Sequence, residues 1–258
     1  MYMSFCKQLL GVQKQTMNEG VMLELGQFPL LIHAKKRAIK NWVRMATGTN
    51  CSDILSEVYQ FSVDEGLQWT ENVETLLSEI GLRQSFISGD PESHLKAFQR
   101  LQDIFHQTTL EKIKHEDSRL RTYALFKTTP GFEKYLDEIS SLKERTALTK
   151  LRISNHKLMI EKGRHTRPKT HKSLRLCPFC PDQVEDEKHF LIRCQTYKHF
   201  RSDLYNKVKN LHPTITNQPY EYRFLNLMGN ANTGQISRFT SKAMELRDFL
   251  LSNHKMHG

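Results

Sequence analysis

Three cysteines and one histidine lie close together in the second half of the chain. Cys177, Cys180, His189 and Cys194 form the pattern Cys-x2-Cys-x8-His-x4-Cys within 18 residues. Thiolate sulfur and imidazole nitrogen are ligands that zinc accepts, and two close pairs of them suit a tetrahedral ion. Because the protein supplies all four ligands, the pattern predicts a closed, structural Zn²⁺ site rather than a catalytic one. The alternative is a chance cluster of free thiols and one core histidine, which the metal-ligand spacing disfavours.

Two local elements must position these ligands. Pro178 fixes the backbone φ angle inside the turn that carries the first cysteine pair. Asp186 is the expected N-cap of a short helix that carries His189. On an ideal helix, residues five apart lie about 140° apart. We therefore expect this helix to unwind or tighten near Cys194 if both residues bind one ion.

The positive charge of the chain is concentrated around this motif. The formal net charge is +10, and residues 141–210 hold 17 Lys or Arg against 7 Asp or Glu, while the remaining residues balance at 21 of each. Such an excess predicts a surface that meets phosphates. A basic face that serves only solubility is the alternative. The candidate phosphate contacts are Arg152, Arg164, Arg167, Lys169, Lys172, Arg175, Arg193, Lys198 and Arg201. His165, Phe179 and Tyr197 are candidates to stack on unpaired bases, although the two aromatic residues could equally belong to the core.

Composition excludes several other classes of protein. The N-terminal residues lack a secretory signal pattern, and no stretch approaches the roughly 20 apolar residues that cross a bilayer. With five cysteines and no such signal, we expect a reducing, intracellular compartment. Cys6 and Cys51 are then expected to be buried free thiols.

The apolar periodicity predicts a mostly α fold with a small zinc-knuckle-like module and C-terminal helices. Helices are expected at about 1–20 (broken near 18–20), 30–46, 52–66, 71–80, 91–105, 118–127, 132–139, 142–161, 197–208 and 235–252. Residues 212–220 contain two prolines and are interpreted as a linker. We divide the chain into a helical region at 1–140, a basic region with the CCHC motif at 141–210, and a linker with a C-terminal helix at 211–258.

Several phrases of the sequence resemble the region downstream of the reverse transcriptase domain in LINE-type (non-LTR) retrotransposon polyproteins. They are FCKQLLGV at 5–12, ELGQFPL at 24–30, LRISNHKLMIEKGR at 151–164, the CCHC motif with its acidic stretch at 185–194, and FLNLM at 224–228. Gln27 stands where the family phrase has Arg. The resemblance implies that the four motif residues bind zinc, that the region contacts RNA or DNA, and that the chain works in the nucleus with other retroelement proteins.

Catalytic motifs are missing from the sequence. The chain has no Asp-Asp pair to hold catalytic metals and no phosphate loop of the Gly-x4-Gly-Lys-Ser/Thr type. Five histidines, at 33, 94, 106, 115 and 156, are scattered without a convincing nucleophile partner. We therefore expect a protein that is not an enzyme.

Two functions of different classes remain open at this point. The first is a zinc-stabilised nucleic-acid-binding fragment of a retrotransposon polyprotein, with low sequence specificity, no membrane partner and an open oligomeric state. The second is a zinc-dependent protein-docking module, and an inert relic of a retroelement is a third possibility. Salt separates the first two, because phosphate binding weakens steeply with salt and an apolar interface does not.

Overall fold

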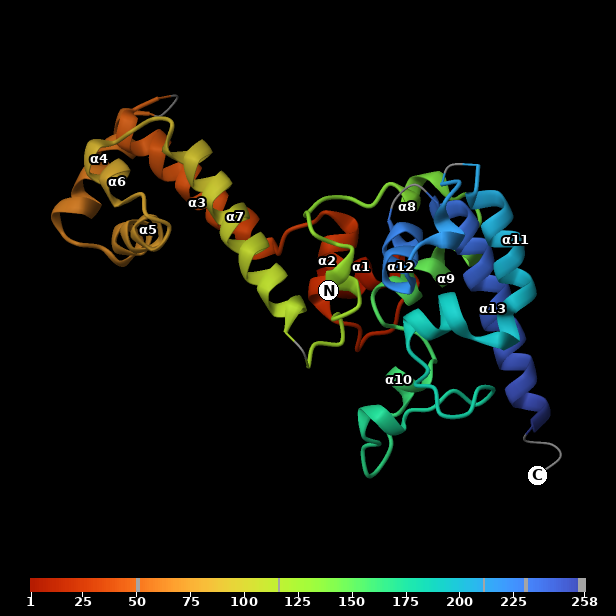
Figure 1. The fold of residues 1–258 in the computed structure, drawn as a ribbon. Coiled ribbons are helices and arrows are strands. Elements are labelled where there is room, and N and C mark those ends of the chain that lie inside the picture. Colours follow the sequence, from red (N-terminus) through yellow and green to blue (C-terminus); the bar gives the residue numbers. More distant parts are fainter. Residues whose placement is uncertain (50–51, 116, 211, 230–231, 255–258) are drawn as a thin grey trace. The chain divides into compact units, whose positions relative to one another are not determined.

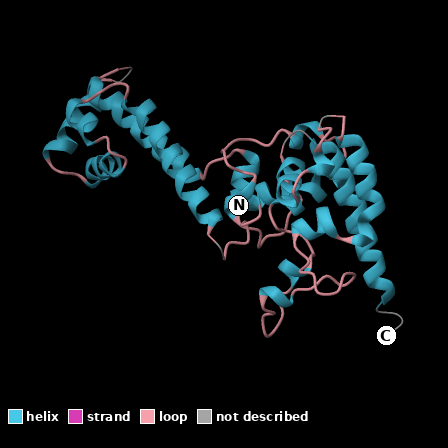
Figure 2. Cartoon of the chain, in the orientation of Figure 1, coloured by secondary structure: helices cyan, strands magenta, loops and turns pink. Residues whose placement is uncertain are grey.

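The computed structural model describes residues 1–49, 52–115, 117–210, 212–229 and 232–254, and its regular secondary structure there is helical. About 67% of the chain is helical. Within the described ranges there is no strand, only two isolated bridges that pair Leu25 with Phe132 and Leu176 with Val184 (Figure 2). The mostly α prediction is therefore confirmed. None of the described helices combines the length and apolar character that a membrane crossing requires.

The chain forms two compact units. One consists of Met1–Gln27 with Lys112–Gly258, and the other of Phe28–Glu111. We call them unit 1 and unit 2; their elements are labelled in Figure 1. The three regions predicted from the sequence are each continuous along the chain. Unit 1, in contrast, combines two separate stretches and contains residues of all three regions.

Unit 2 consists of helices that the sequence predicts, apart from the short helix Arg83–Ser88, which was not expected. They are α3 (Leu30–Thr47), α4 (Asp53–Asp64), α5 (Gln68–Glu79), α6 (Arg83–Ser88) and most of α7 (Ser93–Lys114). Trp42 is fully buried at the centre, stacked on Phe86 with 5.3 Å between ring centroids. Its indole Nε1 donates a hydrogen bond to the hydroxyl of Tyr59 at 3.1 Å. Cys51 lies outside the described residues.

Unit 1 holds the remaining elements, several of which differ from expectation. Its helices are α1 (Tyr2–Leu9), α2 (Asn18–Leu25), η1 (Tyr123–Leu125), α8 (Tyr135–Glu138), α9 (Leu142–Arg152), α10 (Met159–Lys162), η2 (Lys172–Leu174), η3 (His189–Arg193), η4 (Gln195–Tyr197), α11 (Lys198–Val208), η5 (Ile215–Asn217), α12 (Tyr220–Met228) and α13 (Thr233–His254). The predicted break at 18–20 is instead the start of α2, and Gly20 in its first turn lies close to the side chain of Leu120. The expected helix at 118–127 is reduced to the short turn η1. Cys6 is buried, as expected.

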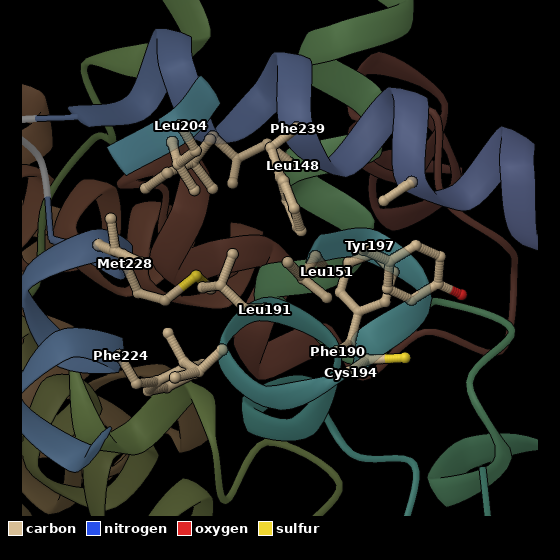
Figure 3. Close-up of a cluster of buried hydrophobic side chains, with 14 of the residues drawn as sticks. Leu148, Leu151, Phe190, Leu191, Cys194, Tyr197, Leu204, Phe224, Met228 and Phe239 are labelled. Atoms are coloured by element: carbon tan, nitrogen blue, oxygen red, sulfur yellow. The ribbon is translucent and has the colours of Figure 1, made fainter. Parts of the chain in front are cut away.

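The main core of unit 1 includes the segment that carries the metal motif. Phe190 is fully buried and packs edge-on against Tyr197 and Phe239, with ring centroids 5.0 and 5.7 Å apart. Figure 3 shows these side chains between α9, α12 and α13, with the Cys194 sulfur at the edge of the cluster. The motif is therefore built into the hydrophobic core.

A buried ionic network lies in the same unit. The Arg152 side chain is 2% exposed; its Nε donates to Glu24 Oε1 at 2.9 Å and its Nη2 to Glu133 Oε2 at 2.6 Å. Its Nη1 donates to the carbonyl of Met228 at 2.9 Å. This corrects the expectation that Arg152 contacts phosphates, because its guanidinium is used entirely inside the protein.

Replacing Arg152 with alanine is expected to lower the free energy of unfolding by about 3–5 kcal/mol, because the buried carboxylate of Glu24 loses its cation and that of Glu133 keeps only Lys127. Urea denaturation followed by circular dichroism measures this change. Arg238→Ala removes an arginine whose side chain is 62% exposed and should cost little. Equal stability of the two variants would show that the buried ionic network of Arg152 does not stabilise the fold.

Candidate metal centre

The four motif residues converge in space. One ligand atom from each of Cys177, Cys180, His189 and Cys194 lies within 4.8 Å of all the others. The sulfurs of Cys180 and Cys194 are 3.7 Å apart. Two sulfurs of a tetrahedral site with metal–sulfur bonds of about 2.3 Å would lie about 3.8 Å apart. The cluster could therefore hold a metal ion.

The first cysteine pair lies on a turn whose base is closed by backbone hydrogen bonds. The amide of Cys177 donates to the carbonyl of Gln183 at 2.7 Å, and the amide of Glu185 donates to that of Arg175 at 2.9 Å. Asp182 adopts a left-handed conformation at φ 57°, which aspartate tolerates better than most residues. These features hold both thiols on one side of the turn.

The second pair is presented by a widened helical turn. Asp186 Oδ1 accepts a hydrogen bond from the His189 amide at 2.7 Å, so the predicted N-cap is confirmed. The amide of Cys194 donates to the carbonyl of His189 at 2.8 Å, five residues back, and the segment is a π-helix. Cys194 then leaves the helical conformation at ψ 121°. The helix thus widens and then ends, where we expected it to unwind or tighten.

The chemistry of the cluster fits a cation. Both ring nitrogens of His189 are buried without a hydrogen-bond partner in the protein, which is costly unless another group satisfies them. A hydrogen bond from the Cys177 thiol lowers the pKa of Cys194 well below its ordinary value. The same bond, with burial, raises the pKa of Cys177. Cysteine sulfurs and an unsatisfied imidazole nitrogen are the donors that a metal ion would use.

Arg201 supports this cluster from behind. It is 7% exposed, and its guanidinium donates to the carbonyls of Leu191 at 2.9 Å and Cys194 at 2.7 Å. This corrects the prediction that Arg201 meets phosphates. It is a positioning residue, which fixes the backbone of one ligand and brings a positive charge close to the thiols.

Replacing Arg201 with methionine is expected to weaken metal affinity by about 10–100-fold, the usual cost of losing an outer-shell partner. Competition with a chromophoric chelator measures the affinity. Lys207→Met, an exposed change on the same helix, is the matched control. If the Arg201 variant binds the metal as tightly as the wild-type chain, Arg201 does not help to position the metal ligands.

The basic loop before the motif is held in shape by its own residues. Arg175 is 8% exposed, and its guanidinium donates to the carbonyls of Ile160 at 2.6 Å and Thr170 at 3.1 Å. Gly163 makes room for it, because a Cβ there would lie 2.7 Å from the Arg175 side chain. The expectation that Arg175 contacts phosphates is corrected, since Arg175 anchors the loop from inside.

The other predicted contacts divide by exposure. Arg164 is half-buried and donates to Glu161 at 3.1 Å. The exposed members are Arg167, Lys169, Lys172, Arg193 and Lys198, and none of them forms an ion pair with another described residue. Of the three stacking candidates, His165 is exposed and Phe179 half-buried, whereas Tyr197 is only 1% exposed. Tyr197 is therefore a core residue and is withdrawn as a stacking candidate.

Two residues near the centre were missed by the sequence reasoning. Tyr220 and Arg223 lie on α12 and line the same cleft as Cys180 and His189. Pro219 directly precedes α12, and proline is common where a helix starts. This signal could have placed the end of the predicted linker at Pro219 and the start of a helix at Tyr220.

No family model, curated protein or solved structure matches this chain at the threshold for a significant similarity.

Proposed function

We propose that this chain is a zinc-stabilised nucleic-acid-binding fragment derived from a non-LTR retrotransposon polyprotein, without that polyprotein's catalytic domains. The retroelement origin rests on the ordered sequence phrases described above. The zinc and nucleic-acid parts rest on the geometry of unit 1.

Zinc is the metal that the ligand set favours. Three cysteines and one histidine form a soft, closed donor set of the kind found in structural zinc sites. Bound zinc would join the turn of Cys177 to the π-helix of His189. Its chemistry there is structural, because all four positions belong to protein side chains. Three thiolates outweigh the charge of Zn²⁺, and the guanidinium of Arg201 offsets the excess.

Nucleic-acid binding is supported chiefly by the loop that leads into this centre. Arg167, Lys169 and Lys172 are exposed and form no ion pairs among the described residues. Hydrogen bonds from Thr166 and Thr170 to Gly163 hold the loop in one conformation. Unpaired cations on an ordered loop meet phosphates with little loss of conformational entropy.

Fluorescence anisotropy of the zinc-loaded chain with labelled oligo-uridine and duplex DNA tests the proposal. Affinity should fall steeply between about 50 and 200 mM salt, because binding releases counterions from the strand. Single-stranded RNA is expected to bind more tightly than duplex DNA. Absence of binding to either nucleic acid at the lower salt concentration would refute the proposed function.

A protein-docking role is the second candidate, and one feature of unit 2 favours it. Ile54, Val58 and Phe61 lie along α4 at helical spacing and are 70%, 55% and 60% exposed. An apolar stripe of this kind is typical of a helix that meets another protein. Binding through it would change little with salt.

A further inference from the structure

A cleft of about 500 Å³ lies beside the metal cluster. Cys180 and His189 form part of its wall, and the rest comes from the metal-motif segment with η3 and η4, from α11 and from α12. Pockets for bound ligands commonly measure roughly 300–1,000 Å³. The cations that line it are Arg193, Lys198, Arg201 and Arg223. Not one of the described lining residues is acidic.

The positive charge of the cleft is not neutralised by the described part of the protein. None of its four cations forms an ion pair there, and Glu221 on α12 is paired with Lys188 instead. Arg201 is already occupied by the backbone carbonyls of Leu191 and Cys194. Arg193, Lys198 and Arg223 are left to face the cleft, and their combined field selects an anion.

Tyr220 organises two of these cations before any ligand arrives. The guanidinium carbons of Arg193 and Arg223 lie 4.8 and 4.9 Å from its ring centroid, which is cation–π distance. Arg223 Nε also donates to the carbonyl of Gln218 at 2.7 Å. Guanidinium groups held in this way match the oxygens of a phosphate and lose little entropy on binding it.

We infer that this cleft binds the phosphodiester backbone of a single nucleic-acid strand, with Arg193, Lys198 and Arg223 as its phosphate contacts. The inference rests on the proposed function and assigns a second contact site in addition to the loop at 164–172. The metal cluster forms one wall of this site, so metal binding would also hold the cleft in shape.

Chemical modification of arginines tests the inference on the wild-type chain. The test therefore does not depend on whether a variant folds. The zinc-loaded chain is treated with phenylglyoxal, with and without saturating oligo-uridine of about 20 nucleotides, longer than most single-strand sites. Modified arginines are located by peptide mass spectrometry. Arg193 and Arg223 should be protected by the RNA, while exposed Arg100 in unit 2 should react equally in both samples.

The outcomes separate this inference from the proposed function. If RNA binds but Arg193 and Arg223 react as fast as in its absence, the cleft inference fails and the loop alone remains. If no RNA binds, the proposed function fails and the inference fails with it. Protection of Arg100 to the same degree would show that the RNA shields arginines from the reagent over the whole surface rather than at one site. That result would also overturn the inference.

A double variant gives an independent measure. Arg193→Gln with Arg223→Gln should lower the slope of log affinity against log salt by about 1.4, the value for two lost single-strand phosphate contacts. Arg37→Gln with Arg100→Gln removes the same charge from exposed positions of unit 2 and should leave the slope unchanged. Equal slopes for both double variants would contradict the inference.

Discussion

Replacing Cys180 with serine should abolish stoichiometric metal binding and locally unfold the chain at about residues 175–205. Cys180 is only half-buried, so exchanging its sulfur for oxygen damages the packing little and isolates the loss of a ligand. Structural zinc binding contributes about 10–16 kcal/mol in small domains, which matches or exceeds the whole stability of a typical protein. Since Cys177 and Cys194 belong to the core of unit 1, the loss should reach that core.

Native mass spectrometry gives the metal stoichiometry of this variant, and near-ultraviolet circular dichroism reports its tertiary packing. Cys6→Ser is the control, because Cys6 lies in unit 1 outside the ligand cluster, and its full burial makes the exchange at least as disruptive to packing as the one at Cys180. That control should lose some stability and keep its metal. One tightly bound metal ion in the Cys180 variant would show that this cysteine is not a ligand.

Reversing three charges on the basic loop should weaken nucleic-acid binding strongly. In Arg167→Glu, Lys169→Glu and Lys172→Glu combined, three phosphate contacts are lost and three repulsions are gained. The slope of log affinity against log salt should fall by about 2, since each contact with a single strand contributes about 0.7. The helices should remain folded, because all three side chains are exposed.

The control for this variant carries the same change in net charge elsewhere. Arg37→Glu, Lys40→Glu and Arg100→Glu alter three exposed positions of unit 2. Anisotropy titrations over a salt series compare the two triple variants with the unmodified chain. If both lose affinity equally, binding follows net charge alone and the loop is not the contact surface.

The metal cluster could be predicted from the sequence because metal chemistry is local. The four ligands lie within 18 residues, and their spacing limits how the segment can fold. Asp186 could likewise be identified as a cap from its position alone. From the sequence we could predict that the helix is not ideal near Cys194, but not that it widens to a π-helix. That form depends on how Phe190 and Leu191 pack in the core.

The roles of the basic residues could not be read from the chain in the same way. Nothing in the sequence distinguishes Arg152, Arg175 and Arg201 from the other basic residues of the region. Each of their guanidinium groups is nevertheless buried and bonded to groups that a count of charges cannot identify. Arg152 meets Glu24, which lies 128 residues away along the chain. Whether a cation is a surface contact or an internal anchor is decided by tertiary packing, and the charge pattern describes only the region as a whole.

The most direct test of the account is X-ray absorption at the zinc edge on the purified, metal-loaded chain. The account predicts one zinc per chain with three sulfur neighbours at about 2.3 Å and one nitrogen at about 2.0 Å. Such a result would establish the closed Cys177, Cys180, His189 and Cys194 centre on which the proposed function depends. A chain that binds no zinc, or binds it through oxygen and nitrogen alone, would contradict the account and favour an inert relic.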